Sequence, residues 1–149
     1  MNNCFETHEP VIFTGDVGGV RIGVQSPVVP PCPPPDINIE DWLSSIQLLR
    51  NRPVQHLFLT HYDLITDKEA HLNALESTLL NWAEWMRPYA EQQTPVADIV
   101  PLFEAYVTQQ LTEAGVDAAG RERYNKANPA FMSVTGLMRY WKKKLTIPA

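Results

Sequence analysis

Two residues of types that bind metals each follow a short apolar run in this sequence. Asp16 ends the segment 11–16, and His61 ends the segment 56–61. We expect both runs to be buried strands, because a continuous apolar run is typical of a strand covered on both faces. Ligands of α/β sheets gather beyond the carboxyl ends of strands, so both side chains are expected to face one crevice. A carboxylate and an imidazole there indicate a metal site.

The residues around Asp16 form a glycine-rich loop with Gly15, Gly18 and Gly19. Glycine permits a positive φ and a close approach of the backbone to a ligand, so this loop is suited to bringing Asp16 to a metal. Phosphate binding is the alternative use of such a loop. The glycine spacing fits neither GxGxxG nor a P-loop, and no Lys-Ser/Thr pair follows, which argues against phosphate.

Two neighbours of His61 are candidates for a supporting role. We expect Tyr62 and Asp63 to line the pocket or to orient His61, and neither is assigned as a ligand. A lone histidine is weak evidence for a metal site. The other histidines are assigned elsewhere: His8 to a loop, His56 to the start of a strand, and His71 to the surface or the packing of a helix.

Composition limits the class of protein. A chain of 149 residues with 44% hydrophobic content is long enough to bury a core. A net charge of −5 argues against nucleic acid, and the short basic run 142–144 is expected to be a helix end. No stretch of about 18 apolar residues indicates a membrane helix, and the N-terminus does not resemble a secretory signal. We therefore expect a cytoplasmic protein in which Cys4 and Cys32 are reduced thiols.

The first part of the chain predicts a βαβ unit. A proline-dominated stretch, residues 26–35, follows the first strand and is expected to be an ordered crossover. Asn38 is predicted to cap a helix that ends at Pro53, and the second strand follows. A strand, a crossover helix and a second strand imply parallel pairing.

The sequence after residue 65 predicts helices. Residues 66–69 have the form of a capping box, and residues 94–95 provide a cap and a proline for the start of another helix. Gly115 is the expected C-cap of that helix, and Asn128-Pro129 is expected to start the last one. We expect Pro88 to loosen the last turn of its helix and Pro101 to kink the next.

Three segments in this order, 11–16, 33–37 and 57–61, resemble the C-terminal half of metallo-β-lactamase-fold hydrolases. The resemblance extends over nearly the whole chain, including a helical extension with Asn128-Pro129 that is found in one bacterial branch of that superfamily. It implies an α/β (α+β) fold. Residues 1–65 would form part of an αββα sandwich, and residues 66–149 would form a mainly α-helical extension packed on it.

The resemblance also implies an activity and its ligands. In the family, the residue corresponding to Asp16 bridges two metal ions, and the residue corresponding to His61 completes the second metal site. Zinc is the expected metal, with iron or manganese as alternatives. The pair of metals serves to hydrolyse an ester, thioester or lactone-like bond with activated water.

This chain departs from the family pattern upstream of Asp16. The family motif His-x-His-x-Asp-His is missing, only fifteen residues precede Asp16, and the usual glycine after the histidine and aromatic residue is replaced by Asp63. We therefore expect an N-terminal complementing fragment to supply the missing ligands and to cover an exposed sheet face and edge strand. A homodimer through the helical extension is a further expected contact. The alternative function is that of a non-catalytic remnant or a helical interaction module.

Overall fold

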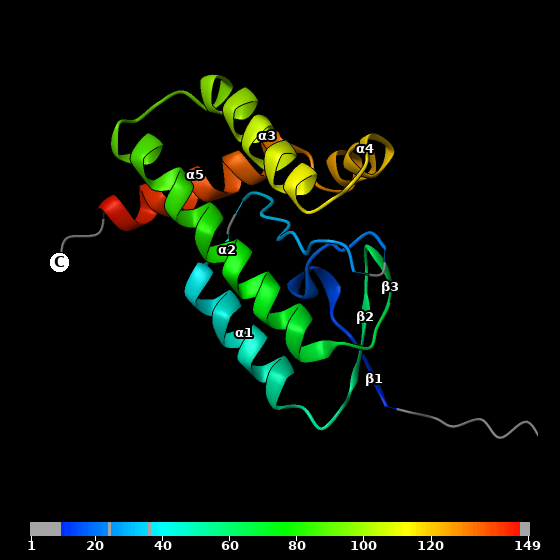
Figure 1. Cartoon of the computed structure of the whole chain (residues 1–149). Helices are drawn as coiled ribbons and strands as arrows, with labels where there is room; N and C mark the ends of the chain where they lie inside the picture. The colour runs from blue at the N-terminus through cyan, green and yellow to red at the C-terminus, as the bar shows by residue number, and fades with distance from the viewer. Residues whose placement is uncertain (1–9, 24, 36, 147–149) are drawn as a thin grey trace, which may run out of the picture.

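A computed structural model describes residues 10–23, 25–35 and 37–146, and this part of the chain is mixed α/β and mostly helical (Figure 1). The α/β class expected from the sequence is confirmed. The described elements are β1 (Val11–Phe13), a 3₁₀ turn (Gly15–Gly18), α1 (Ile39–Asn51), β2 (His56–Leu59), β3 (Tyr62–Ile65), α2 (Lys68–Glu91), α3 (Val96–Glu113), α4 (Ala118–Ala127) and α5 (Ala130–Thr146).

The strands form one small sheet in the order β1-β2-β3. β1 pairs with β2 in parallel, with Val11 opposite His56 and Phe13 opposite Phe58. Helix α1 lies in the connection between these two strands. The βαβ unit predicted from the sequence is therefore confirmed.

The segment 56–61 is not a single strand, and this expectation was wrong. β2 ends at Leu59, after which the chain reverses and returns as the antiparallel strand β3. The sequence did not indicate β3, because it is short and its second residue, Asp63, has a low preference for strands. His61 consequently lies in the connection of a β-hairpin.

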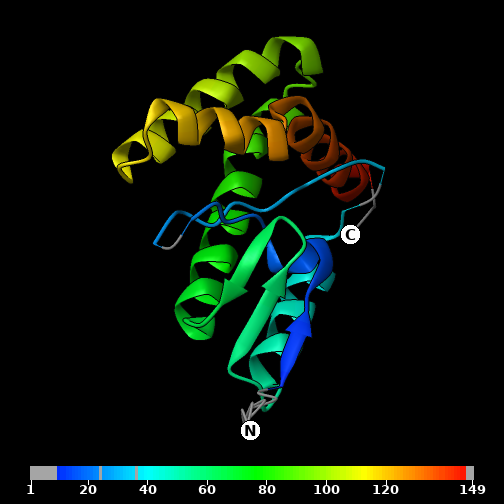
Figure 2. The same ribbon diagram turned by 90° about the vertical axis from the view of Figure 1, so that its right-hand side faces the viewer.

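Among the described residues, helices cover one face of the sheet only, which corrects the expectation of strands buried on both sides. Figure 2 shows the sheet in front of α1 and α2, which lie together behind it. Leu57 and Ile65 on the covered face are 0% and 5% exposed. Phe13, Phe58 and Leu64 form the opposite row and are 78%, 39% and 42% exposed. An exposed apolar sheet face is thus present, as the sequence led us to expect.

The caps of α1 and α2 differ from each other. Asn38 caps α1 as predicted, because its side-chain oxygen accepts a hydrogen bond from the Asp41 amide at 3.1 Å. The predicted capping box at residues 66–69 is not formed: α2 begins at Lys68, and the Asp67 side chain makes no cap bond. Its carboxylate instead accepts two hydrogen bonds from the buried Arg21 guanidinium, at 2.7 and 3.1 Å.

The later helices follow the predicted pattern with two corrections, the start of α3 and the presence of α4. The cap expected at Thr94 is absent, since Pro95 occupies the N-cap position of α3. Pro88 and Pro101 lie inside α2 and α3, as the sequence indicates, and the loosened turn and the kink expected at them stay predictions. Helix α4 was not predicted, because its mostly polar sequence has no apolar stripe. Gly115 has a φ of +81° just after α3, which suits the predicted helix end.

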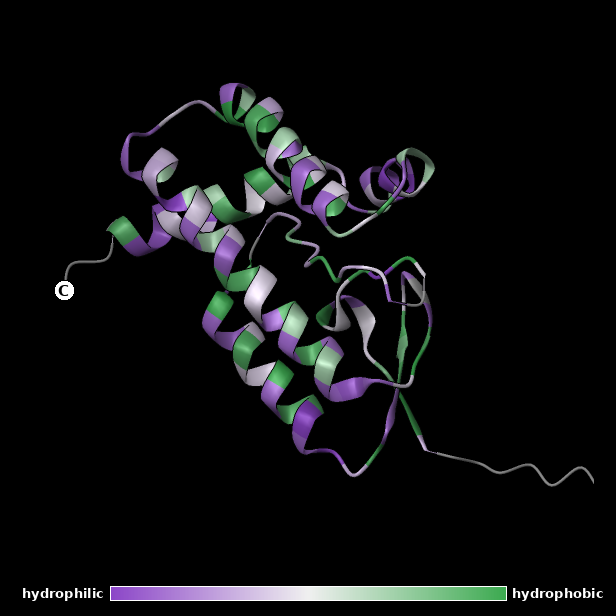
Figure 3. Cartoon of the chain, viewed as in Figure 1, coloured by the Kyte–Doolittle hydropathy of each residue, from purple (hydrophilic) through white to green (hydrophobic). Residues whose placement is uncertain are grey.

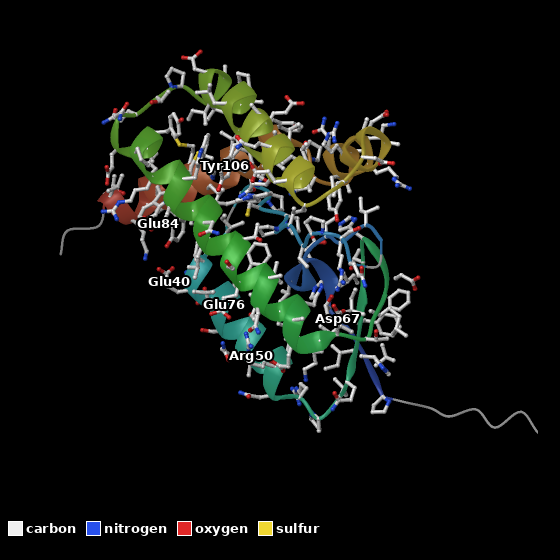
Figure 4. The ribbon with its side chains drawn as sticks, viewed as in Figure 1. Glu40, Arg50, Asp67, Glu76, Glu84 and Tyr106 are labelled. Carbon is white, nitrogen blue, oxygen red and sulfur yellow. The ribbon has the colours of Figure 1, made fainter. Side chains whose placement is uncertain are left out.

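Helix α2 connects the sheet side of the structure to the C-terminal helices. It packs against α1 and α5, and the buried apolar residues form one continuous core. Figure 3 shows the helices as alternating polar and apolar segments, as expected of amphipathic helices with one buried face. Between α1 and α2, the Arg50 guanidinium binds the Glu76 carboxylate at 2.9 Å, and Figure 4 shows both side chains.

The proline-rich crossover is ordered against α5. The Arg139 Nε donates to the Pro35 carbonyl at 2.7 Å, and the side-chain Nδ2 of Asn128, which precedes α5, donates to the Pro30 carbonyl at 3.2 Å. Gly136 lies where the two backbones come closest, and a Cβ added there would overlap the Cys32 carbonyl oxygen. The absence of a side chain at residue 136 therefore permits this close approach.

We expect Gly136→Ala to destabilise the protein, because the added methyl group must push α5 away from the crossover backbone. The free energy of unfolding should fall by about 2 kcal/mol or more, as is usual for overpacking against backbone. Urea denaturation measures this change. Lys142→Ala, on the exposed side of the same helix, is the control and should leave stability nearly unchanged. Equal stability of Gly136→Ala and the unaltered protein would contradict the described packing.

Candidate functional site

Asp16 and His61 lie side by side. The His61 Nε2 is 3.2 Å from an Asp16 carboxylate oxygen. Asp16 comes from the 3₁₀ turn after β1, and His61 comes from the hairpin connection after β2. The proximity predicted from the ends of the two parallel strands is therefore found in the structure.

The backbone around Asp16 is fixed at both ends of its turn. Before the turn, the Thr14 amide donates to the Phe58 carbonyl at 3.1 Å, which extends the parallel pairing by one residue. Gly15 then has a φ of +58°, a conformation that glycine adopts at little cost. After the turn, the Gly19 amide donates to the Asp16 carbonyl at 3.0 Å. Asp16 thus lies at the outside of a tight, hydrogen-bonded turn.

The position of His61 depends on Val20. Val20 is fully buried and forms bridges to two segments, a parallel one to His61 and an antiparallel one to Val29. Because Val20 follows the Asp16 turn by a few residues, the same short segment ties the turn to the hairpin. Backbone pairing therefore holds the two side chains near each other from both sides.

Side chains from α1 and α2 contact the turn on its helix side. The Trp42 Nε1 of α1 donates to the Val17 carbonyl at 3.0 Å, and the His71 Nε2 of α2 is 2.7 Å from the Gly18 carbonyl oxygen. His71 is only 1% exposed, so of the two places expected for it, surface or packing, the second is found. The packing position could be expected, because His71 precedes the apolar Leu75 by one helical turn and both are buried.

The Asp16–His61 pair fits half of a metal site. Two ligand atoms at about 2.1 Å from a tetrahedral ion lie roughly 3.4 Å apart, close to the observed 3.2 Å. Both side chains are accessible, with Asp16 57% and His61 38% exposed. Within the described ranges, however, no group of three or more His, Cys, Asp or Glu side chains is placed to hold a metal. Among the described residues, the pair would therefore supply two of the three protein ligands that a catalytic zinc needs.

The other candidate residues do not join this pair. His56 begins β2, and the Asp63 carboxylate accepts a hydrogen bond from the neighbouring Leu64 amide at 2.7 Å. Cys32 is fully buried, and burial raises the pKa of its thiol. His8, Cys4 and the Tyr62 side chain lie outside the described part of the chain.

A separate crevice of about 320 Å³ opens beside α3 and α4. Its wall includes Trp82, Phe103 and Leu111, and neither Asp16 nor His61 lines it. Tyr124 also lines it, and its hydroxyl donates to the Pro27 carbonyl at 2.6 Å within the protein. Charged side chains such as Glu104, Arg121 and Glu122 also line it, so this crevice is a feature separate from the Asp16–His61 pair.

Compared with known proteins, the chain matches no protein-family model, no curated protein and no solved structure. In the residues that the structure covers, none of the helices combines the length and apolar character needed to cross a membrane.

Histidine 71 is expected to make stability depend on pH. Burial is the main cause that lowers the pKa of His71; nearby Arg21 lowers it further, while the hydrogen bond to Gly18 and the charge of Asp67 oppose this. The unfolded chain therefore takes up a proton at about pH 6.5 that the folded chain resists. The contribution of His71 to the free energy of unfolding should be fully present above pH 6.5. It should be lost as the pH falls through 6.5 toward the lower pKa of His71 in the folded protein.

Urea denaturation between pH 7.5 and 5 tests this expectation. His71→Gln keeps a donor for the Gly18 carbonyl but cannot titrate, so its stability should fall less over this range. The difference between the two proteins isolates residue 71 from the other histidines. Identical pH profiles would contradict the assignment of His71 as a buried neutral group.

Proposed function

We propose that this chain is the C-terminal part of a metal-dependent hydrolase of the metallo-β-lactamase superfamily. In this proposal residues 1–65 form part of an αββα sandwich, and residues 66–149 form the helical extension. The observation that supports it most is the Asp16–His61 pair, 3.2 Å apart at the carboxyl ends of two parallel strands. The family resemblance assigns a ligand role to each of these positions.

Each side chain has a defined part in the proposed site. The Asp16 carboxylate has two oxygens, which suits a ligand that bridges two cations, and the side chain is 57% exposed. The neutral His61 imidazole would offer Nε2 to the second cation. A pair of zinc ions held there would lower the pKa of bound water and polarise the scissile carbonyl group. Iron or manganese suits the same ligand types.

The remaining ligands must come from a partner. The sequence lacks His-x-His-x-Asp-His, and the pair alone is two ligands. The exposed sheet face supports docking of an N-terminal fragment, because Phe13, Phe58 and Leu64 form an apolar row across all three strands. An apolar face of this kind usually marks an interface. This face belongs to the same strands that lead to Asp16 and His61.

Metal analysis of the purified chain, alone and mixed with the polypeptide encoded directly upstream, tests the proposal. We expect about two equivalents of zinc, iron or manganese in the mixture and much less in the chain alone, because metal binding requires the full ligand set. Asp16→Ala and His61→Ala should each reduce the metal content of the mixture. His56→Ala, at the start of β2 and away from the hairpin connection that carries His61, is the matched control.

The exposed face provides a second control. Phe13→Asp places a charge on a residue that is 78% exposed, so the chain should stay folded but lose the fragment and its metal. If the fragment binds the unaltered chain and the complex takes up no metal, the hydrolase proposal is wrong. That result would favour the non-catalytic remnant or helical interaction module.

A further inference from the structure

The turn that carries Asp16 is held by two ring N–H groups from two different helices. The Trp42 indole donates to the Val17 carbonyl at 3.0 Å, and the His71 imidazole lies 2.7 Å from the Gly18 carbonyl oxygen. The two acceptors are consecutive residues of the turn. A turn fixed at successive carbonyls cannot rotate its peptide planes without breaking one of these bonds.

The tautomer of His71 follows from its partner. A carbonyl oxygen only accepts hydrogen bonds, so Nε2 must carry the proton and donate. Nδ1 is then a bare acceptor, and it is buried without a hydrogen-bond partner among the described residues. Burial of an unsatisfied nitrogen is costly, and an apolar side chain at residue 71 would avoid that cost. The fold nevertheless places a histidine here and directs its donor at the turn.

The other side of the turn has no room to relax. A Cβ at Gly18 would overlap the Thr14 hydroxyl and lie 2.7 Å from a Leu59 methyl group. Gly18 is therefore enclosed between the strand ends on one side and the His71 ring on the other. The two hydrogen bonds hold the turn from the helix side, and Thr14 and Leu59 limit its movement on the other side.

The two members of the pair depend on different supports. The His61 backbone is bridged to Val20, whereas the Asp16 carbonyl accepts the Gly19 amide inside the turn that Trp42 and His71 hold. Loss of a ring donor should consequently release Asp16 and leave His61 in place. The Gly19 amide reports on this release, because it exchanges with solvent when its bond to Asp16 opens.

We propose that Trp42 and His71 are positioning residues that set the orientation of the Asp16 carboxylate relative to His61. The link to metal binding rests on the proposed function. The contacts of Trp42 and His71 with the turn are present in the chain without any metal. Neither residue touches the metal position in this account. They act through the Val17 and Gly18 carbonyls.

Hydrogen exchange of the chain alone, followed by NMR, tests the positioning role without any metal. His71→Leu removes the donor and keeps an apolar side chain, and Trp42→Phe removes the indole donor and keeps a ring. Each should raise the exchange rate of the Gly19 amide roughly threefold to tenfold, as loss of one hydrogen bond implies. The Leu57 amide in the buried strand should be unchanged. His71→Gln should restore protection, because its amide presents a donor near the position of Nε2.

A merely structural role gives a different pattern. If Gly19 and Leu57 change together in both variants, or if His71→Gln behaves like His71→Leu, the positioning role is overturned. Metal affinity of the mixture with the upstream polypeptide should also fall by roughly threefold to tenfold in His71→Leu and recover in His71→Gln. Absence of metal binding by the unaltered mixture would refute the proposed function, whereas an unchanged Gly19 exchange rate would refute the positioning role.

Discussion

The parallel pairing of β1 and β2 places Asp16 and His61 at one edge of the sheet. With Phe13 opposite Phe58, both strands end at the same level, and the chain leaves each of them in the same direction. An antiparallel pairing would have put the two strand ends at opposite edges. Val20 then closes the arrangement, because its bridge to His61 ties the end of the Asp16 turn to the hairpin. The pair therefore follows from backbone pairing before any side chain is considered.

The two faces of the sheet have different roles. Helices α1 and α2 cover one face, and the same helices supply Trp42 and His71 to the turn, so core packing and site geometry are coupled. The other face keeps an apolar row exposed across three strands. An exposed apolar face of this kind often marks an interface. The proposal of a partner that brings further ligands accounts for both observations.

Some of the structure could be predicted from residue patterns, and the reason is local in each case. The apolar stripe of α2 and the side-chain cap at Asn38 each depend on residues that lie within a few positions of one another in the sequence. The parallel pairing of β1 and β2 could be predicted from the length of the connection between them. Helix α4 and strand β3 were missed because neither has a clear apolar period.

Other features depend on contacts between distant segments. Phe13 is as apolar as any core residue, so the sequence alone does not predict that it is exposed. Its exposure follows from the placement of α1 and α2 on the same face of the sheet. The proximity of Asp16 and His61 could be predicted from the strand ends, but the support from His71 could not. This support depends on how α2 is rotated about its axis relative to the sheet. The spacing of apolar residues predicts that rotation only to within about one residue position.

Mn²⁺ added to the isotope-labelled chain in complex with the upstream polypeptide tests the central claim most directly. A paramagnetic ion broadens the NMR signals of nearby amides, and the effect falls steeply with distance. The account predicts that the amides of residues 15–18 and of Thr60 and His61 broaden first and together. Broadening that instead gathers at surface carboxylates such as Glu84 and Glu91, with these amides unaffected, would contradict a metal site at the Asp16–His61 pair.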